Sequence, residues 1–163
     1  MTDERIGDAL LPTLRRLPPG SGVVFRHRAT APADRRALFR AVRRVATARR
    51  LYLASVGGLG GSVRHGGPRP FTAPAHDRAQ AIRAARAGAR LVFVSPVFPT
   101  ASHPGTRALG PGRAAAIARG LDVEVIALGG MDARRWRAIR HLGFDGWAAI
   151  GALTGQKRKA VPT

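Results

Sequence analysis

Short apolar runs that alternate with longer amphipathic segments constrain the fold of this chain more than any other feature. Runs long enough for strands occupy residues 22–26, 51–55, 71–75, 91–95, 123–128 and 147–150. Their largely continuous apolar character is typical of parallel strands that are buried on both faces. Between them, apolar residues at helical spacing predict helices at 4–17, 33–50, 77–87, 111–119 and 132–143. The alternation predicts an α/β fold of parallel βα units, of the TIM (β/α)8 barrel type.

Capping residues and loops refine this outline. Thr30 is predicted to be the N-cap of the 33–50 helix and Asp132 that of the last helix. Asp34 and Asp77 are predicted to be first-turn helix charges. The glycine-rich stretch 57–70 is predicted to be a loop, with at most a stub of strand near Ser62 to Arg64.

Length and composition indicate one domain at residues 1–154, followed by a basic, flexible tail at 155–163. The chain has no cysteine, and no apolar run approaches the ~20 residues that span a bilayer. The first five residues are polar and acidic and do not resemble a secretory signal. We therefore expect a cytoplasmic protein that does not enter a membrane.

The charge of the chain is strongly positive, with 28 lysines and arginines against 9 acidic residues and a net charge of +19. Such a charge attracts polyanions at long range. The arginines are spread over several predicted helices. Only 6 % of the residues are aromatic, so few side chains could stack on the bases of a nucleic acid. Nucleic-acid binding is therefore expected to be at most non-specific, through the basic surface and the tail.

Candidate site residues are sought at the carboxyl ends of the predicted strands, where parallel βα folds place their sites. Arg26 and Arg28 stand two apart, so both would lie on one face of a strand, where they could clamp a diphosphate. Gly129, Gly130 and Gly151 follow the last two strands and could offer backbone N–H groups to a phosphate. The alternatives are a solvated arginine pair and tight βα turns.

Two histidines, His76 and His103, also follow predicted strands, although such a histidine is often structural or solvated. Neither has the spacing of a metal site. The few acidic residues are largely assigned to helix starts, so the residues themselves predict no metal site.

Three segments resemble the thiamine phosphate synthase and thiazole tautomerase family. They are Val92–Thr100 (Val-Phe-Val-Ser-Pro-Val-Phe-Pro-Thr), Val125–Met131 (Val-Ile-Ala-Leu-Gly-Gly-Met) and Gly146–Ile150 (Gly-Trp-Ala-Ala-Ile). They are similar to the family's strand-six, strand-seven and strand-eight segments. The resemblance is good over residues 71–153 and weaker over 3–55, where Val24–Arg28 looks like the family's Gln-x-Arg-x-Lys.

This resemblance implies a transferase of thiamine biosynthesis that joins a hydroxymethylpyrimidine diphosphate to a thiazole phosphate and releases pyrophosphate. It implies Mg²⁺ as cofactor and small phosphorylated heterocycles as substrates. The residues implied in catalysis are Arg26, Arg28 and His103. Those implied in substrate binding are His76, Ser95, Thr100 and Ser102, and those implied in phosphate binding are Gly129, Gly130, Ile150 and Gly151.

The chain also departs from the family's pattern. Ala54-Ser55 stands where the family has Asn-Asp, whose Asp binds Mg²⁺, and a second metal-binding Asp has no counterpart in 57–70. The family's loop lysine is His103, and Pro74 replaces the serine of its Ser-x-His motif. With 163 residues, the chain is also shorter than the usual lower bound of about 200 residues for a barrel of this kind. We expect a barrel that is shortened or incomplete at strand 1 and around strands 3–4.

These departures leave several functions open. The chain could be an active synthase, a catalytically degenerate barrel that binds a phosphorylated heterocycle, or a basic nucleic-acid-binding protein. The tautomerase activity is disfavoured, because Pro96 stands where that enzyme has its catalytic histidine. The sequence does not determine the oligomeric state.

Overall fold

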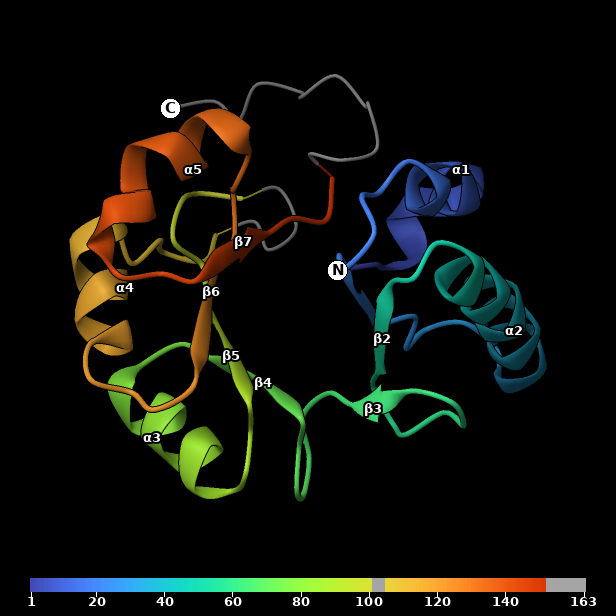
Figure 1. The fold of residues 1–163 in the computed structure, drawn as a ribbon, viewed down its shortest axis with the longest axis horizontal. Helices are drawn as coiled ribbons and strands as arrows, with labels where there is room; N and C mark the ends of the chain where they lie inside the picture. Colours follow the sequence, from blue (N-terminus) through green and yellow to red (C-terminus); the bar gives the residue numbers. More distant parts are fainter. Residues whose placement is uncertain (101–104, 152–163) are drawn as a thin grey trace.

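A computed structural model describes residues 1–100 and 105–151, and its strands surround the middle of the molecule with helices outside them (Figure 1). The strands are β1 (Gly22–Phe25), β2 (Tyr52–Ser55), β3 (Val63–Arg64), β4 (Thr72–Ala75), β5 (Leu91–Val94), β6 (Glu124–Leu128) and β7 (Gly146–Ala148). The α-helices are α1 (Leu10–Arg15), α2 (Pro32–Ala48), α3 (Arg78–Arg86), α4 (Pro111–Ala118) and α5 (Ala133–Ile139). Two 3₁₀ helices, η1 (Glu4–Ala9) and η2 (Arg140–Leu142), complete the list.

The strands form two parallel sheets, one in the order β1-β2-β3 and the other in the order β4-β5-β6-β7. Sequential order with every pair parallel is the topology of βα units wound in one direction. The predicted α/β fold of the TIM-barrel type is therefore confirmed. The missing helices after β2 and β3 correspond to the glycine-rich stretch 57–70, where only β3 forms.

Two narrow seams connect the sheets. At one seam, an isolated bridge pairs His65, just after β3, with Thr72 at the start of β4. At the other, the chain's first residues lie between β7 and β1: the Met1 amino group donates to the Ala149 carbonyl (3.0 Å), and the Thr2 N–H donates to the Val24 carbonyl (2.9 Å). Residues 1–3 thus occupy the place of a first barrel strand without forming one.

Alternating side chains divide the core into an inside and an outside. An inner cluster of Val24, Ala54, Phe93 and Leu128 joins residues of both sheets. The residues next to these point the other way, so that Val23 and Phe25 pack with α1 and α2 while Val92, Val94 and Ala127 pack with α3, α4 and α5. This in-and-out alternation is the one that a barrel requires.

Several local predictions need correction. The predicted helix 4–17 is divided into η1 and α1, and it is not regular even within η1, where Gly7 adopts the non-helical angles φ 52° and ψ −138°. The N-cap of α2 is Ala31 and makes no side-chain cap, whereas the Thr30 hydroxyl donates to the Glu4 carboxylate (3.4 Å). Asp77 is the N-cap of α3, where its carboxylate accepts from the Gln80 N–H (2.7 Å).

Other local predictions are confirmed. Asp132 caps α5, and Asp34 lies in the first turn of α2. Among the described residues, no helix is long and apolar enough to cross a membrane. The predicted basic tail at 155–163 lies outside the described residues, as do Ser102 and His103.

Candidate functional site

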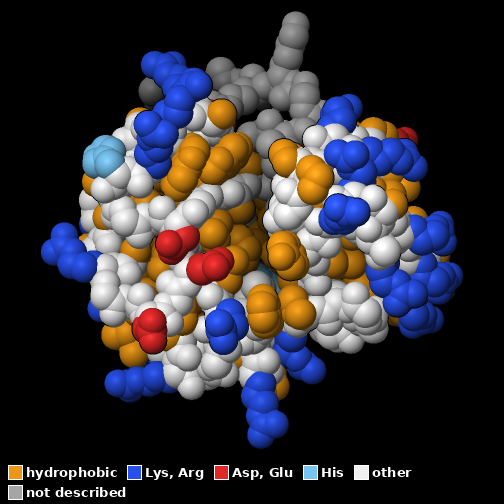
Figure 2. Space-filling view, viewed as in Figure 1, with side chains coloured by type: hydrophobic (Ala, Val, Ile, Leu, Met, Phe, Trp, Pro, Cys, Tyr) orange, Lys and Arg blue, Asp and Glu red, His pale blue; other side chains and the backbone are white. Residues whose placement is uncertain are grey.

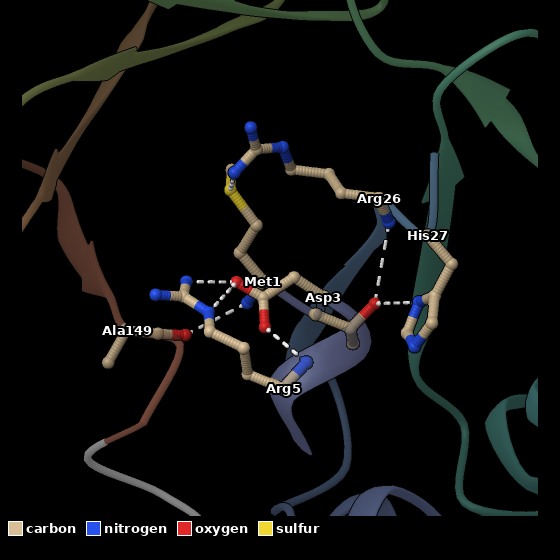
Figure 3. A network of polar contacts seen from close by, with 7 residues as sticks. Met1, Asp3, Arg5, Arg26, His27 and Ala149 are labelled. Carbon is tan, nitrogen blue, oxygen red and sulfur yellow. Dashed lines mark hydrogen bonds and ion pairs between the residues drawn. The ribbon is translucent and has the colours of Figure 1, made fainter. Parts of the chain in front are cut away.

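Arg26 and Arg28 follow β1, which ends at Phe25, so neither arginine belongs to the strand as predicted. The pairing nevertheless continues one step further, because the Val56 N–H donates to the Phe25 carbonyl (3.1 Å). Val24 faces inward, and alternation therefore turns Arg26 to the inside of the barrel. Its guanidinium Nη1 lies 3.4 Å from the Met1 Sδ, and Met1 itself packs on the inner cluster (Figure 3).

The residue between the two arginines anchors them. His27 is buried on the outside, where its ring stacks on Phe25 with a centroid distance of 4.5 Å. The Arg35 guanidinium of α2 donates to the carbonyls of His27 and Val56, both at 2.5 Å. The segment after β1 that carries both arginines is thus fixed from outside the barrel.

The acidic groups around Arg26 are already engaged. The Asp3 carboxylate forms an ion pair with Arg5 (Figure 3). The Glu4 carboxylate accepts from the Ala29 N–H (2.7 Å). Burial lowers the pKa of Arg26, and the charge of nearby Arg28 lowers it further. Within the described residues Arg26 forms no ion pair. A half-buried guanidinium at Arg26 and an exposed one at Arg28, which repel each other, favour an anion between them.

His65 is a site residue that the sequence reasoning missed. It lies just after β3, and only 5 % of its surface is exposed. Its Nδ1 lies 2.8 Å from the Thr72 Oγ1, and its ring meets that of Phe93 edge-to-face at 5.6 Å. Burial lowers the pKa of His65 to about 4, with further lowering by Arg26 and Arg28. The signal available in the sequence was the alternation Val63-x-His65, hidden among glycines.

His76 and Ser95, predicted from neighbouring strand ends, are brought together. The His76 Nδ1–H donates to the Ser95 carbonyl (2.7 Å), and the Ser95 Oγ lies 3.4 Å from the same nitrogen. This bond assigns the proton to Nδ1 and leaves Nε2 as an acceptor. The His76 side chain is exposed and the Ser95 side chain is buried, so the imidazole is held at the rim.

Gly129 and Gly130 form the turn after β6, with φ of 91° and 62°. A Cβ on Gly129 would lie 2.6 Å from the Pro96 Cα, and one on Gly130 would lie 2.5 Å from the Pro99 carbonyl oxygen. The turn therefore packs closely on the loop after β5. The carbonyl of Gly129 accepts from Phe98, and that of Gly130 from Arg135, whereas in the described residues no acceptor binds either glycine N–H.

The remaining predicted residues are placed as follows. Ile150 packs on the hydrophobic cluster of α1, β1 and α2, so the chain beyond β7 crosses to the first sheet. Gly151 is exposed and Thr100 is half-buried. Ser102 and His103 lie outside the described residues. The roles proposed for all of these residues stay predictions.

The residues at the expected metal position do not fit Mg²⁺. Ala54 belongs to the apolar inner cluster, and the neighbouring Ser55 faces outward, where its Oγ bonds to the Ser62 hydroxyl (2.6 Å) and the Leu59 N–H (3.0 Å). Among residues 1–100 and 105–151, no group of three or more His, Cys, Asp or Glu side chains could hold a metal ion. Mg²⁺ prefers carboxylate and other oxygen ligands, which this site does not gather.

The charge of the surface contrasts with that of the interior. Arginines project around the outside, most densely over α1 and α2, while hydrophobic side chains line the hollow between the two halves in this view (Figure 2). A cleft of about 620 Å³ lies between α4, η2 and the start of β6, lined by residues such as Leu121, His141 and Asp145. That cleft is at the amino ends of β6 and β7, away from the basic and glycine groups described above.

Fold and site together define a parallel barrel-type βα protein with arginines and a glycine turn at the carboxyl ends of its strands. The model of the thiamine monophosphate synthase family matches residues 71–153, which is 83 of the 163 residues. The chain belongs to the thiamine monophosphate synthase family.

Two curated relatives show the extent of the sequence similarity. The thiamine-phosphate synthase of Desulfitobacterium hafniense (strain Y51) is 33 % identical over 79 residues, which is 48 % of this chain and 38 % of that protein. That of Geobacillus thermodenitrificans (strain NG80-2) is 35 % identical over 81 residues, 48 % of this chain and 37 % of that protein. The matched segment spans less than two fifths of the length of these relatives.

The fold is similar over nearly the whole chain. Thiamine phosphate pyrophosphorylase from Pyrococcus furiosus superposes with a TM-score of 0.78 at 18 % identity, covering 96 % of this chain and 86 % of that one. The enzyme of that name from Bacteroides thetaiotaomicron has a TM-score of 0.61 at 16 % identity, covering 99 % and 86 %. At these identities the likeness establishes the fold alone.

Proposed function

We propose that this protein is a transferase of the thiamine phosphate synthase type. It would join a hydroxymethylpyrimidine diphosphate to a thiazole phosphate and release pyrophosphate. The observation that carries the proposal is the pairing of two features in a chain of this family. Arg26 and Arg28 lie at one strand end, and the N–H groups of Gly129 and Gly130, which bind no acceptor in the part of the chain that the structure describes, lie at another.

The chemistry of the reaction suits such a site. The bond between the pyrimidine methylene carbon and the diphosphate oxygen breaks, and its electron pair leaves with pyrophosphate. The thiazole nitrogen then donates its lone pair to the resulting cation, which forms the new C–N bond. This reaction requires fixed positive charge beside the leaving group, and it requires no protein nucleophile. In our proposal the two arginines supply that charge, and the glycine amides hold the thiazole phosphate.

A direct assay tests this function. Thiamine phosphate formation from the two phosphorylated precursors is measured with Mg²⁺ present and then with EDTA. We expect product from the wild-type protein and a loss of about 100-fold or more in kcat/KM for Arg26→Ala, because a charge-assisted contact to the leaving group is removed. Arg44→Ala, on the exposed face of α2, is the matched control and should retain full activity.

The alternative is a barrel that binds a phosphorylated heterocycle without turning it over, which is favoured by the absence of Mg²⁺ ligands at Ala54 and Ser55. It predicts binding of the pyrimidine diphosphate that is weakened by Arg26→Ala, or binding of thiazole phosphate that is weakened by substitution of Gly129, with no product under any condition. A folded protein that neither forms product nor binds either precursor would contradict both functions.

A further inference from the structure

We propose that His65 joins Arg26 and Arg28 in an anion site that takes the diphosphate of the substrate without a divalent cation. This inference rests on the proposed function, since it specifies how that site would hold its ligand. It assigns His65 a direct contact with the anion, and it replaces the metal by fixed cations of the chain.

The register of the first sheet places these residues together. Val24 pairs with Ala54, and Ala54 pairs with Val63, so the three share the inner face. The ladder continues past the strands, because the His65 N–H donates to the Ser55 carbonyl (2.9 Å) as Val56 does to Phe25. Arg26 lies two residues beyond Val24, and His65 lies two residues beyond Val63. Both side chains therefore face inward, at the same level of the barrel.

The surroundings of His65 orient its ring toward this level. Thr72, from β4, engages Nδ1, and Phe93, from β5, contacts the ring edge-to-face. Within the described residues, Nε2 has no hydrogen-bond partner. The inner cluster forms an apolar floor beneath, to which Phe93 belongs. A buried imidazole with one nitrogen engaged and the other available is suited to donate a hydrogen bond to a ligand.

The charges that act on His65 come mainly from the end of β1. They are Arg26 and Arg28, with the Met1 amino group adding a smaller effect, while Thr72 and Phe93 are uncharged. All three charges are positive, so they oppose protonation of the imidazole while the site holds no anion. A bound diphosphate offsets them and favours the imidazolium, whose two N–H groups then donate to the ligand and to the Thr72 hydroxyl. Binding should therefore be accompanied by proton uptake.

Calorimetric titration with sodium pyrophosphate tests this. The titration is done at pH 6.5 with EDTA, in two buffers of different ionisation enthalpy, so that proton uptake is measured alongside affinity. We expect the wild-type protein to bind with EDTA present and to take up a fraction of a proton. In His65→Phe the proton uptake should be smaller than in the wild type, because only the Met1 amino group, whose pKa is about 6, and pyrophosphate itself still exchange protons there. The affinity should fall about tenfold or more, because a charge-assisted hydrogen bond is lost.

Two further variants complete the experiment. His141→Phe changes an exposed histidine at the opposite edge of the sheet and should match the wild type in both readouts. His65→Gln keeps a polar group beside Thr72 but cannot be protonated, so it should lower the uptake below that of the wild type even if His65→Phe does not fold. Proton uptake unchanged in His65→Gln, or pyrophosphate binding that requires Mg²⁺, would overturn the inference.

The outcomes separate the inference from the proposed function. Pyrophosphate binding that depends on His65, in a protein that forms no thiamine phosphate, would support the metal-free anion site and refute the synthase activity. Synthase activity in a protein whose pyrophosphate binding and proton uptake do not depend on His65 would support the proposed function and refute the metal-free anion site.

Discussion

Two glycines with nearly the same backbone angle are constrained very differently. Gly129 has φ 91° and Gly88 has φ 92°, but a Cβ on Gly129 would lie 2.6 Å from the Pro96 Cα, whereas nothing lies within 4 Å of one on Gly88. The backbone angle alone costs about 1–2 kcal/mol for a residue with a side chain. The collision adds to this only at Gly129, because the obstructing atom belongs to the backbone.

We therefore expect Gly129→Ala to lower the free energy of unfolding by about 3 kcal/mol or more and Gly88→Ala by about 1–2 kcal/mol. Urea denaturation followed by circular dichroism measures both. If the two variants lost the same stability, the loop after β5 would not pack on the Gly129 turn as described.

The titration of His65 gives a second prediction at this scale. Its pKa is lowered to about 4 in the folded protein, mainly by burial, from an ordinary value of 6.5. The unfolded chain therefore binds more protons between these values, so stability rises with pH from about 4 to 6.5 and is lost as the pH falls. The difference corresponds to at most about 3.5 kcal/mol, at about 1.4 kcal/mol per pKa unit.

The checking measurement is urea denaturation at pH 7, 5.5 and 4 for the wild type and His65→Gln. Because glutamine does not titrate, the variant should lose less stability on acidification, and the difference between the two proteins isolates His65 from the carboxyl groups. Parallel losses in both proteins would show that His65 is not buried in its neutral form.

At the scale of elements, residues 1–3 connect the two sheets, and we call this connection the clasp. The buried Thr2 Oγ1 lies 3.2 Å from the His27 Nδ1 and accepts from the Arg26 N–H (3.4 Å), while the Thr2 N–H bonds to Val24. Thr2→Val keeps the shape of the side chain and removes the hydroxyl. It leaves the buried His27 nitrogen without its partner, which costs about 1–3 kcal/mol.

Thermal or urea unfolding of Thr2→Val measures this loss, and Thr47→Val, at an exposed position of α2, is the control that should change little. If the clasp also positions Arg26, pyrophosphate binding should weaken in Thr2→Val and stay unchanged in Thr47→Val. Equal stability of the two variants would argue against the clasp.

Elements were predictable from the sequence where local pattern decides them. Continuous apolar runs identified β1, β2 and β4 to β7, and helical spacing identified α2 to α5, each with ends shifted by a few residues. The first predicted helix was wrong in detail, because helical spacing of apolar residues does not show that Gly7 takes a φ of 52°. His65 was missed because its inward position follows from pairing with Thr72, a contact between segments that no local pattern encodes.

The candidate site was predicted only in outline for the same reason. Arg26, Arg28, His76 and Ser95 were found because strand ends can be read from the sequence. The outward turn of Ser55 and the engagement of the acidic side chains near Arg26 are set by packing between elements. Among the described residues, these contacts leave cationic side chains rather than carboxylates facing the candidate site.

For the molecule as a whole, the excess of positive charge is the dominant electrostatic fact. With a net charge of +19, most cations have no acidic neighbour to pair with. Helix α2 shows the consequence locally: Arg36, Arg40 and Arg44 are all exposed and follow each other at i, i+4 spacing. Like charges at this spacing destabilise a helix by a few tenths of a kcal/mol per pair, and salt screens the effect.

Repulsion within the whole molecule should therefore make the fold more stable in salt. We expect the free energy of unfolding in urea to rise between 0.05 and 0.5 M NaCl. The Debye length is above about 10 Å at the lower salt concentration and below it at the higher one. Arg40→Glu turns two repulsive pairs into attractive ones and should stabilise the protein by about 0.5–1 kcal/mol at low salt, with the gain lost at high salt. Arg40→Gln, which removes repulsion without adding attraction, should give about half of it. A gain that persists in 0.5 M NaCl, or wild-type stability that falls with added salt, would mean that the surface charges do not govern the stability of this fold.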